Sequence, residues 1–317
     1  MSFRIRSLAT VLLFVILLAP SVRCGDWPKD YVVQENSKSP DGRFAILVLT
    51  QAAAIDQDAD ESTVYLADVK NHTTLGEIEK VNYFEHQNHR GLEVYWAPDS
   101  SYCVVQNDAR YGVDTISILE IKDSSFAQTQ IDERIQKSLD DVMKKLSHDK
   151  EMSGDVSPHF RLGNDRKVKV RATSQNNPKQ FDNVKTYYAL FQGTYDLAAK
   201  KWTVTDARSI TSGQSDLLDS AYNDSFAKQI IVAADDKQVP ESFSGEVFSS
   251  EDDKFDALDK RLNEVYQAVR SLLPPNRFAK VKQEQVVWVK TRDAAKSVEE
   301  KSKVTEGRIE VLQDLLW

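Results

Sequence analysis

The chain has 317 residues, of which 41% are hydrophobic, and its 49 Asp and Glu exceed its 41 Lys and Arg to give a formal net charge of -8. This length allows two domains and a sizeable core. The acidic excess argues against nucleic acid as a partner, because phosphate binding needs clustered basic side chains. It does suit a basic protein partner.

Residues 1–24 have the layout of a secretory signal peptide. Two arginines precede an apolar stretch from Leu8 to Ala19, which is shorter than the roughly 20 residues of a membrane-spanning helix. We expect cleavage between Ser21 and Gly25 and a periplasmic or secreted location; a retained anchor is the alternative. No later stretch is long and apolar enough for a membrane span, so none is expected after cleavage.

The cysteines add little to the expected fold. Cys24 stands where a lipoprotein carries its acylated cysteine, but the bulky Arg23 precedes it, so lipidation is not expected. Cys103 is the other cysteine, and the two could form at most one disulfide. The fold therefore does not depend on disulfides.

Residues 25–213 are predicted to form a β-rich domain. Short runs rich in Val, Ile, Tyr and Thr, bounded by turn residues, are typical of strands. One segment, 131–150, instead has apolar residues at helical spacing and predicts an amphipathic helix packed on the sheet. The predicted strands are 44–49, 64–67, 92–96, 102–105, 115–121, 168–173, 185–195 and 202–209.

Two similar turns precede strands in this domain. Ser39-Pro40-Asp41-Gly42 and Ala97-Pro98-Asp99-Ser100 both combine a proline, which presets the first turn dihedral, with an Asp that can cap the turn. They resemble the blade hairpins of TolB-like and WD40-like propellers. Two copies are too few for a closed propeller, so the resemblance implies a propeller-like sheet unit.

Residues 214–254 are predicted to be an acidic connector, with a helix possible over 217–231. Beyond it, apolar residues at helical spacing predict helices over 255–272, 276–302 and 305–316. Pro274 and Pro275 separate the first two. Residues 255–317 are thus expected to form a small antiparallel three-helix module, and the predicted fold class is α+β.

The helical segment carries three motifs in order. They are Leu262-Asn263 with Tyr266, then Gln285, Trp288, Arg292 and Asp293, then Thr305 with Arg308. This pattern resembles the LprI-type (DUF1311) lysozyme inhibitor family, which implies a binding function. Family members usually carry a cysteine shortly after the Arg-Asp pair, whereas Ala294 and Ala295 follow here, so the module must be held by packing alone.

Two interpretations of the motif residues stay open. Gln285, Trp288 and Arg292 share one helical face, where Arg292 can stack on the indole and still donate hydrogen bonds. Asn263 and Tyr266 are one turn apart on the preceding helix. These groups either join the helices to one another or form a contact surface for a partner.

The sequence predicts no metal site, cofactor or catalytic motif. The segment Asp56–Asp60 imitates a calcium loop but lacks its glycine and its bidentate Glu. We expect an exported, non-enzymatic envelope protein that binds a protein, and the resemblance to the LprI-type family implies a basic lysozyme as that partner. A structural or assembly protein of the bacterial envelope is the alternative. A third hypothesis, a cell-wall hydrolase, would be favoured by paired carboxylates in a pocket.

Overall fold

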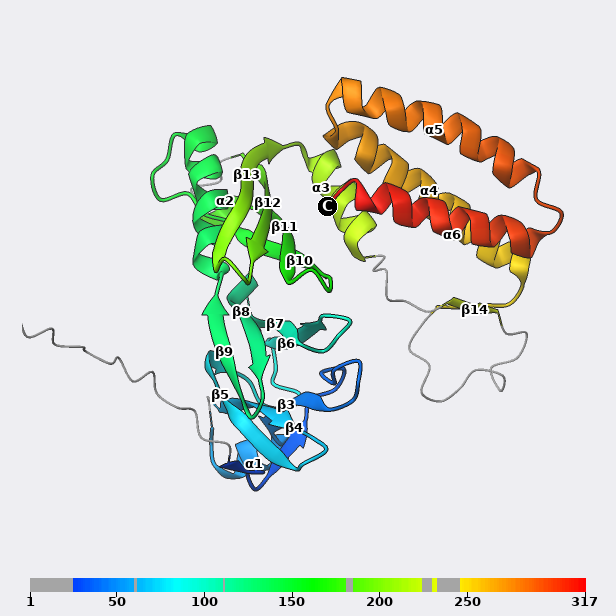
Figure 1. Cartoon of the computed structure of the whole chain (residues 1–317). Coiled ribbons are helices and arrows are strands. Elements are labelled where there is room, and N and C mark those ends of the chain that lie inside the picture. The colour runs from blue at the N-terminus through cyan, green and yellow to red at the C-terminus, as the bar shows by residue number, and fades with distance from the viewer. Residues whose placement is uncertain (1–24, 60–61, 111, 181–184, 224–229, 233–245) are drawn as a thin grey trace, which may run out of the picture.

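A computed structural model describes residues 25–59, 62–110, 112–180, 185–223, 230–232 and 246–317. The predicted signal peptide and Cys24 lie outside the described residues. A β-rich N-terminal part is followed by a helical C-terminal part (Figure 1), which confirms the predicted α+β class. Three antiparallel sheets form the first part, and the described residues include no closed barrel.

The N-terminal sheet has the order β1-β5-β4-β3-β2. The middle sheet has the order β6-β7-β8-β9, and the third sheet the order β10-β11-β12-β13, so both are simple meanders. The strands are β1 (Gly25–Asp26), β2 (Tyr31–Val33), β3 (Phe44–Leu49), β4 (Thr63–Asp68), β5 (Thr73–Asn82), β6 (Gly91–Trp96), β7 (Tyr102–Ala109), β8 (Gly112–Lys122), β9 (Ser125–Gln130), β10 (Asp155–Leu162), β11 (Lys167–Gln175), β12 (Tyr188–Asp196) and β13 (Lys201–Ile210).

The middle sheet is buried on both faces. Along β7, Tyr102 and Val104 face a core shared with the third sheet, while Cys103 and Val105 face a core shared with the N-terminal sheet. Successive side chains of a strand point to opposite faces, so a strand covered on both sides is an unbroken apolar run. This explains why β7 was predicted from composition without an alternating pattern.

The core between the middle and third sheets also includes the predicted amphipathic helix. It is α2 (Asp132–Ser147), and it buries Ile135, Leu139 and Met143. Another helix, the short α1 (Gln51–Asp56), was not predicted. It buries only two alanines, Ala53 and Ala54, which give little helical periodicity to read.

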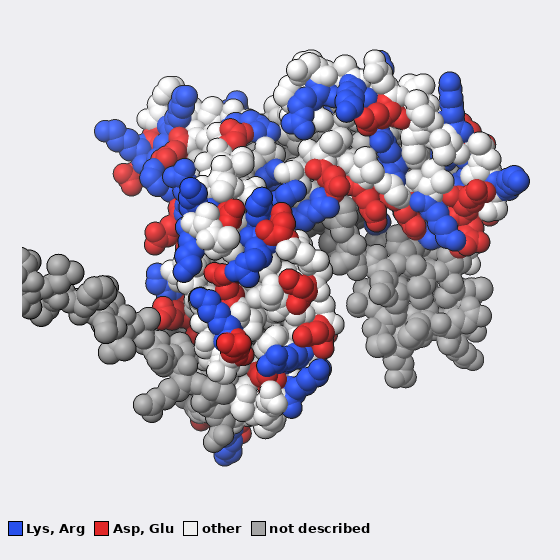
Figure 2. Space-filling model, viewed as in Figure 1, with Lys and Arg blue, Asp and Glu red and all other residues white. Residues whose placement is uncertain are grey.

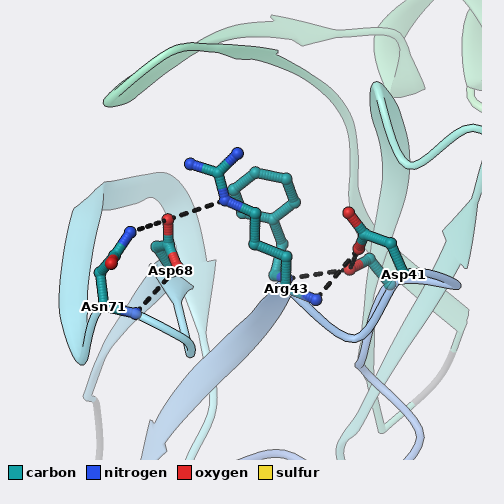
Figure 3. A network of polar contacts seen from close by, with 6 residues as sticks. Asp41, Arg43, Asp68 and Asn71 are labelled. Atoms are coloured by element: carbon teal, nitrogen blue, oxygen red, sulfur yellow. Dashed lines mark hydrogen bonds and ion pairs between the residues drawn. The ribbon is translucent and has the colours of Figure 1, made fainter.

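The first of the two similar turns is held by the carboxylate of Asp41 (Figure 3). Its Oδ1 accepts hydrogen bonds from the Ser39 hydroxyl (2.6 Å) and the Arg43 backbone N–H (3.0 Å). Arg43 Nε donates to Oδ2 of the buried Asp68 (2.9 Å), which also accepts from Asn71. Burial alone would raise the pKa of Asp68, but these hydrogen bonds outweigh it and lower that pKa.

The two turns lie side by side although they are far apart in the sequence. The Asp41 backbone N–H donates to the Ser100 hydroxyl (3.2 Å), and Trp96 Nε1 donates to the Ser37 carbonyl (2.9 Å). The second turn is capped by its own Asp99, which accepts from the Ser101 N–H (3.0 Å). The predicted turn chemistry is thus confirmed, and the turns join the first two sheets. The likeness to propeller hairpins stays a prediction.

Four further helices follow the sheets, namely α3 (Ser212–Asn223), α4 (Glu251–Leu272), α5 (Pro275–Asp293) and α6 (Val298–Asp314). Between α3 and α4, the strands β14 (Ile230–Val232) and β15 (Glu246–Phe248) pair in parallel. The prediction of a helix over 217–231 is therefore wrong for residues 230–231, which belong to β14. Residues 224–229 lie outside the residues that the structure describes.

Two helix boundaries also differ from the prediction. The helix predicted over 276–302 ends at Asp293, and the last helix begins at Val298 and not at Thr305. Ser297 is the reason, because its Oγ accepts from the Glu300 N–H (3.1 Å) and caps the new helix. Ser250 acts in the same way on α4, which begins at Glu251, before the predicted start at 255.

The helical part packs on the third sheet. Leu190 of β12 and Leu218 of α3 belong to the same apolar core as α4 and α6. The buried Arg171 of β11 reinforces this contact, since its Nε donates to the Leu316 carbonyl (2.8 Å) and a terminal guanidinium nitrogen donates to the backbone oxygen of Trp317.

Two surface properties bear on function. None of the helices in the described ranges is long and apolar enough to cross a bilayer. On the face drawn in Figure 2, basic and acidic side chains are interspersed over both the sheets and the helices. This face therefore lacks the continuous basic stripe that nucleic acid binding requires.

Candidate functional site

The family-like motifs lie on α4, α5 and α6, whose three helices run side by side (Figure 1). The helix α4 contributes Leu258, Leu262 and Val265 to the core, and α6 contributes Ile309 and Leu312. Of the side chains on α5, only Val281 is fully buried. The attachment of α5 to the other two helices must therefore depend on polar and half-buried groups.

Trp288 and Arg292 join α5 to both neighbours. The half-buried Trp288 donates from Nε1 to the Val304 carbonyl of α6 (3.1 Å). The Arg292 guanidinium lies 5.1 Å from the centre of the Trp288 ring and donates to Asp259 of α4 (2.8 Å). It also contacts its neighbour Asp293 (3.3 Å), which is exposed. The predicted stacking of arginine on indole is present.

A second connection between α5 and α6 is made by Arg308, which is 8% exposed. Its Nε donates to Gln285 Oε1 (2.8 Å), and a terminal nitrogen lies 3.8 Å from the Glu284 carboxylate. Burial lowers the pKa of Arg308, and the charge of Glu284 opposes that change. Gln285 therefore supplies an acceptor that offsets part of the cost of burying the guanidinium.

The remaining motif residues occupy different environments. Leu262 is buried in the core, and Thr305 is buried with its hydroxyl donating to the Lys301 carbonyl (2.8 Å). The Tyr266 ring is half-buried, with its centre 5.5 Å from that of Phe278. Asn263 is exposed and donates to the Asp259 carbonyl one turn before it (2.9 Å). The structure thus brings the Gln285, Trp288, Arg292 and Arg308 side chains to the helix junctions, and leaves Asn263 outside them.

Replacement of Trp288 by alanine should lower the free energy of unfolding by about 2 kcal/mol, as a half-buried indole and one hydrogen bond are lost. Urea denaturation measures this. Val287→Ala is the matched control, because Val287 is the neighbouring residue and is 66% exposed, and it should have almost no effect. Equal effects of the two substitutions would show that Trp288 does not hold the helices together.

The structure also places polar residues together that the sequence did not single out. A cavity of about 840 Å³ lies between β6 and β7 of the middle sheet and β10 of the third. The strand register sets Glu93 opposite Gln106, so Tyr95 and Asp108, each two residues further along, lie on the same face. The Tyr95 hydroxyl donates to Glu93, and Gln106 Nε2 donates to Asp108 Oδ1 (2.8 Å).

The sequence contained only a weak indication of this cavity. The predicted strand 102–105 stops before the polar residues Gln106, Asn107 and Asp108, whereas β7 continues to Ala109. Polar residues on the inner face of a strand that is otherwise apolar are the unusual feature. Glu93, which lies opposite Gln106, belongs to β6, and the sequence alone does not give the register between β6 and β7.

Burial gives the cavity its electrostatic character. It raises the pKa of Asp108, and the nearby charge of Glu93 raises it further against the hydrogen bond from Gln106. Burial lowers the pKa of His159 on β10 to about 4, so this ring is neutral at pH 7. Within the described part of the chain, no group of three or more His, Cys, Asp or Glu is placed to hold a metal ion.

Comparison with known proteins bears on the helical part. Residues 235–314 match the family model described as "Lysozyme inhibitor LprI", a range that includes all of α4, α5 and α6. No curated protein matches the chain.

One solved structure is similar to a limited degree. It is described as "Complex structure of the fission yeast SREBP-SCAP binding domains", with 12% identity, a TM-score of 0.27, and 65% of this chain and 44% of that chain covered. The present chain therefore spans less than half of that one, and values this low do not indicate a shared fold. The C-terminal helical segment is matched by the lysozyme inhibitor LprI family, as its three motifs predicted.

Proposed function

We propose that this protein acts outside the cytoplasm, where it binds a lysozyme and inhibits it by protein–protein contact without catalysing a reaction. The match of residues 235–314 to the LprI family carries this proposal. An extracytoplasmic location is supported by the signal-peptide layout of residues 1–24.

The distribution of charge supports a division of roles between the two parts. Over residues 251–317 the thirteen Lys and Arg equal the thirteen Asp and Glu, so the net charge of -8 resides elsewhere in the chain. A basic lysozyme would therefore be attracted by the β-rich part and by the acidic segment before α4. The helices would contribute specific contacts and not long-range attraction.

The test uses residues 25–317 in an assay of cell-wall clearing by a panel of lysozymes, together with calorimetry at moderate salt. We expect slower clearing and micromolar or tighter binding that weakens as salt is added, since opposite charges are screened. Unchanged clearing at a large excess of the protein would contradict the proposal. The protein without lysozyme is the control for catalysis, because Glu93 and Asp108 line the same cavity and a hydrolase would use two carboxylates in one pocket.

An assembly protein of the envelope is the second candidate. The family match covers residues 235–314 and none of the three sheets, so the match does not account for the β-rich part. In this candidate function the helices serve as a spacer, and the buried Arg171 of β11 would fix them to the β-rich part through its hydrogen bond to Leu316. Retention of other exported proteins, combined with no effect on any lysozyme, would favour this candidate.

A further inference from the structure

We propose that the cavity between β6, β7 and β10 binds the cationic end of a basic side chain, the ammonium of lysine or the guanidinium of arginine. That this basic side chain belongs to the protein partner rests on the proposed function. The site itself rests on independent observations of acceptors, aromatic rings and an unused buried polar atom.

One side chain that lines the cavity has a buried acceptor without a donor. Gln106 is 6% exposed, and its Nε2 is used on Asp108, but its buried Oε1 has no hydrogen-bond partner among the residues that the structure describes. A buried acceptor without a donor is costly. Glu93 and Asp108 line the same space, so an entering N–H group would find two carboxylates beside this unpartnered amide oxygen.

The walls of the cavity suit the aliphatic stem of such a side chain. Tyr95 and Phe160 have ring centres 5.2 Å apart, and Trp317 also lines the space. Aromatic faces attract cations and cover methylene groups at the same time. An anionic ligand would meet two carboxylates here, and a purely apolar ligand would bring no donor to the Gln106 oxygen.

Two other groups of the cavity can carry positive charge, and neither opposes a cation strongly. Arg161 is ion-paired with Asp314 of α6. His159 is neutral at pH 7 because of its burial. With Glu93 and Asp108 on the opposite wall, the remaining charge of the cavity is negative.

The experiment is an NMR titration with Nα-acetyl-lysine methylamide, and with its Nζ-acetylated form as the neutral probe. The indole N–H of Trp317, identified by its loss in Trp317→Phe, reports occupancy. We expect saturable shifts with the cationic probe alone. No shift, or equal shifts with both probes, would overturn the proposal.

Variants locate the site. Asp108→Asn should weaken the cationic probe about tenfold, the size of one charge-assisted hydrogen bond. The substitution is isosteric and removes a half-buried charge, so folding should be retained, and Glu93→Gln, at an exposed residue, provides a second variant. Asp141→Asn makes the same change of charge on α2, outside the cavity, and should have no effect. Equal binding by Asp108→Asn, Glu93→Gln and Asp141→Asn would exclude this cavity.

The lysozyme assay separates this inference from the proposed function. Probe binding without any lysozyme inhibition would leave the cation site standing and remove the proposed function. Inhibition by Asp108→Asn as strong as that by the unaltered protein would show that the cavity does not receive the partner's side chain.

Discussion

Replacement of Arg171 by leucine is expected to lower the free energy of unfolding by about 3 kcal/mol, the largest effect of any single substitution proposed for this protein. Leucine keeps apolar volume but leaves the backbone oxygens of Leu316 and Trp317 without their donor. A hydrogen bond from a charged group contributes about 1.5 to 3 kcal/mol. Urea denaturation followed by circular dichroism measures the loss.

Arg161→Gln is the matched control for this substitution. Arg161 also joins the third sheet to α6, through an ion pair with Asp314, but both side chains are substantially exposed. Such pairs contribute less than about 1 kcal/mol. Similar losses for the two variants would show that apolar packing around Leu190 holds the helices on the sheet, and that the buried arginine does not.

The second large effect concerns acid. The pKa of His159 is about 4 in the folded protein because the ring is buried, against 6.5 for an ordinary histidine. Between these values the unfolded chain binds a proton that the folded protein does not. The free energy of unfolding should therefore fall as pH falls from 6.5 to 4, by about 3 kcal/mol from this residue.

His159→Gln isolates that contribution, since glutamine does not titrate. Carboxylates elsewhere in the protein also respond to acid, but they do so in both proteins, so the difference between the two stability curves reports the histidine. We expect the variant to gain stability relative to the unaltered protein below pH 6.5. Parallel curves down to pH 4 would mean that the ring is accessible to protons in the folded state.

The sequence predicted those strands best that are buried on both faces. The strand predicted over 44–49 is β3, Phe44–Leu49, with all six residues buried. Strands such as β9 (Ser125–Gln130) and β10 (Asp155–Leu162) were missed, because they bury few residues and contain many polar ones. Local composition cannot reveal a strand whose stability comes from its neighbours.

The helical module was predicted in its order and packing but not in all its contacts. The spacing of Trp288 and Arg292 indicated their stacking, since both lie on one helix. The partner of Arg292, Asp259, comes from α4, and the partner of Gln285, Arg308, comes from α6, at distances along the chain that no local pattern encodes. The capping serine at Ser297 could have been recognised from the glutamate three residues after it.

The position of β7 between two cores has a consequence for how changes spread through the molecule. A substitution at Val104 alters packing toward α2 and the third sheet, on which the helices rest, whereas one at Val105 alters packing toward the N-terminal sheet. Adjacent residues of one strand are thus constrained by opposite ends of the protein. The middle sheet is the mechanical link through which a load applied to the N-terminal sheet would reach the helices.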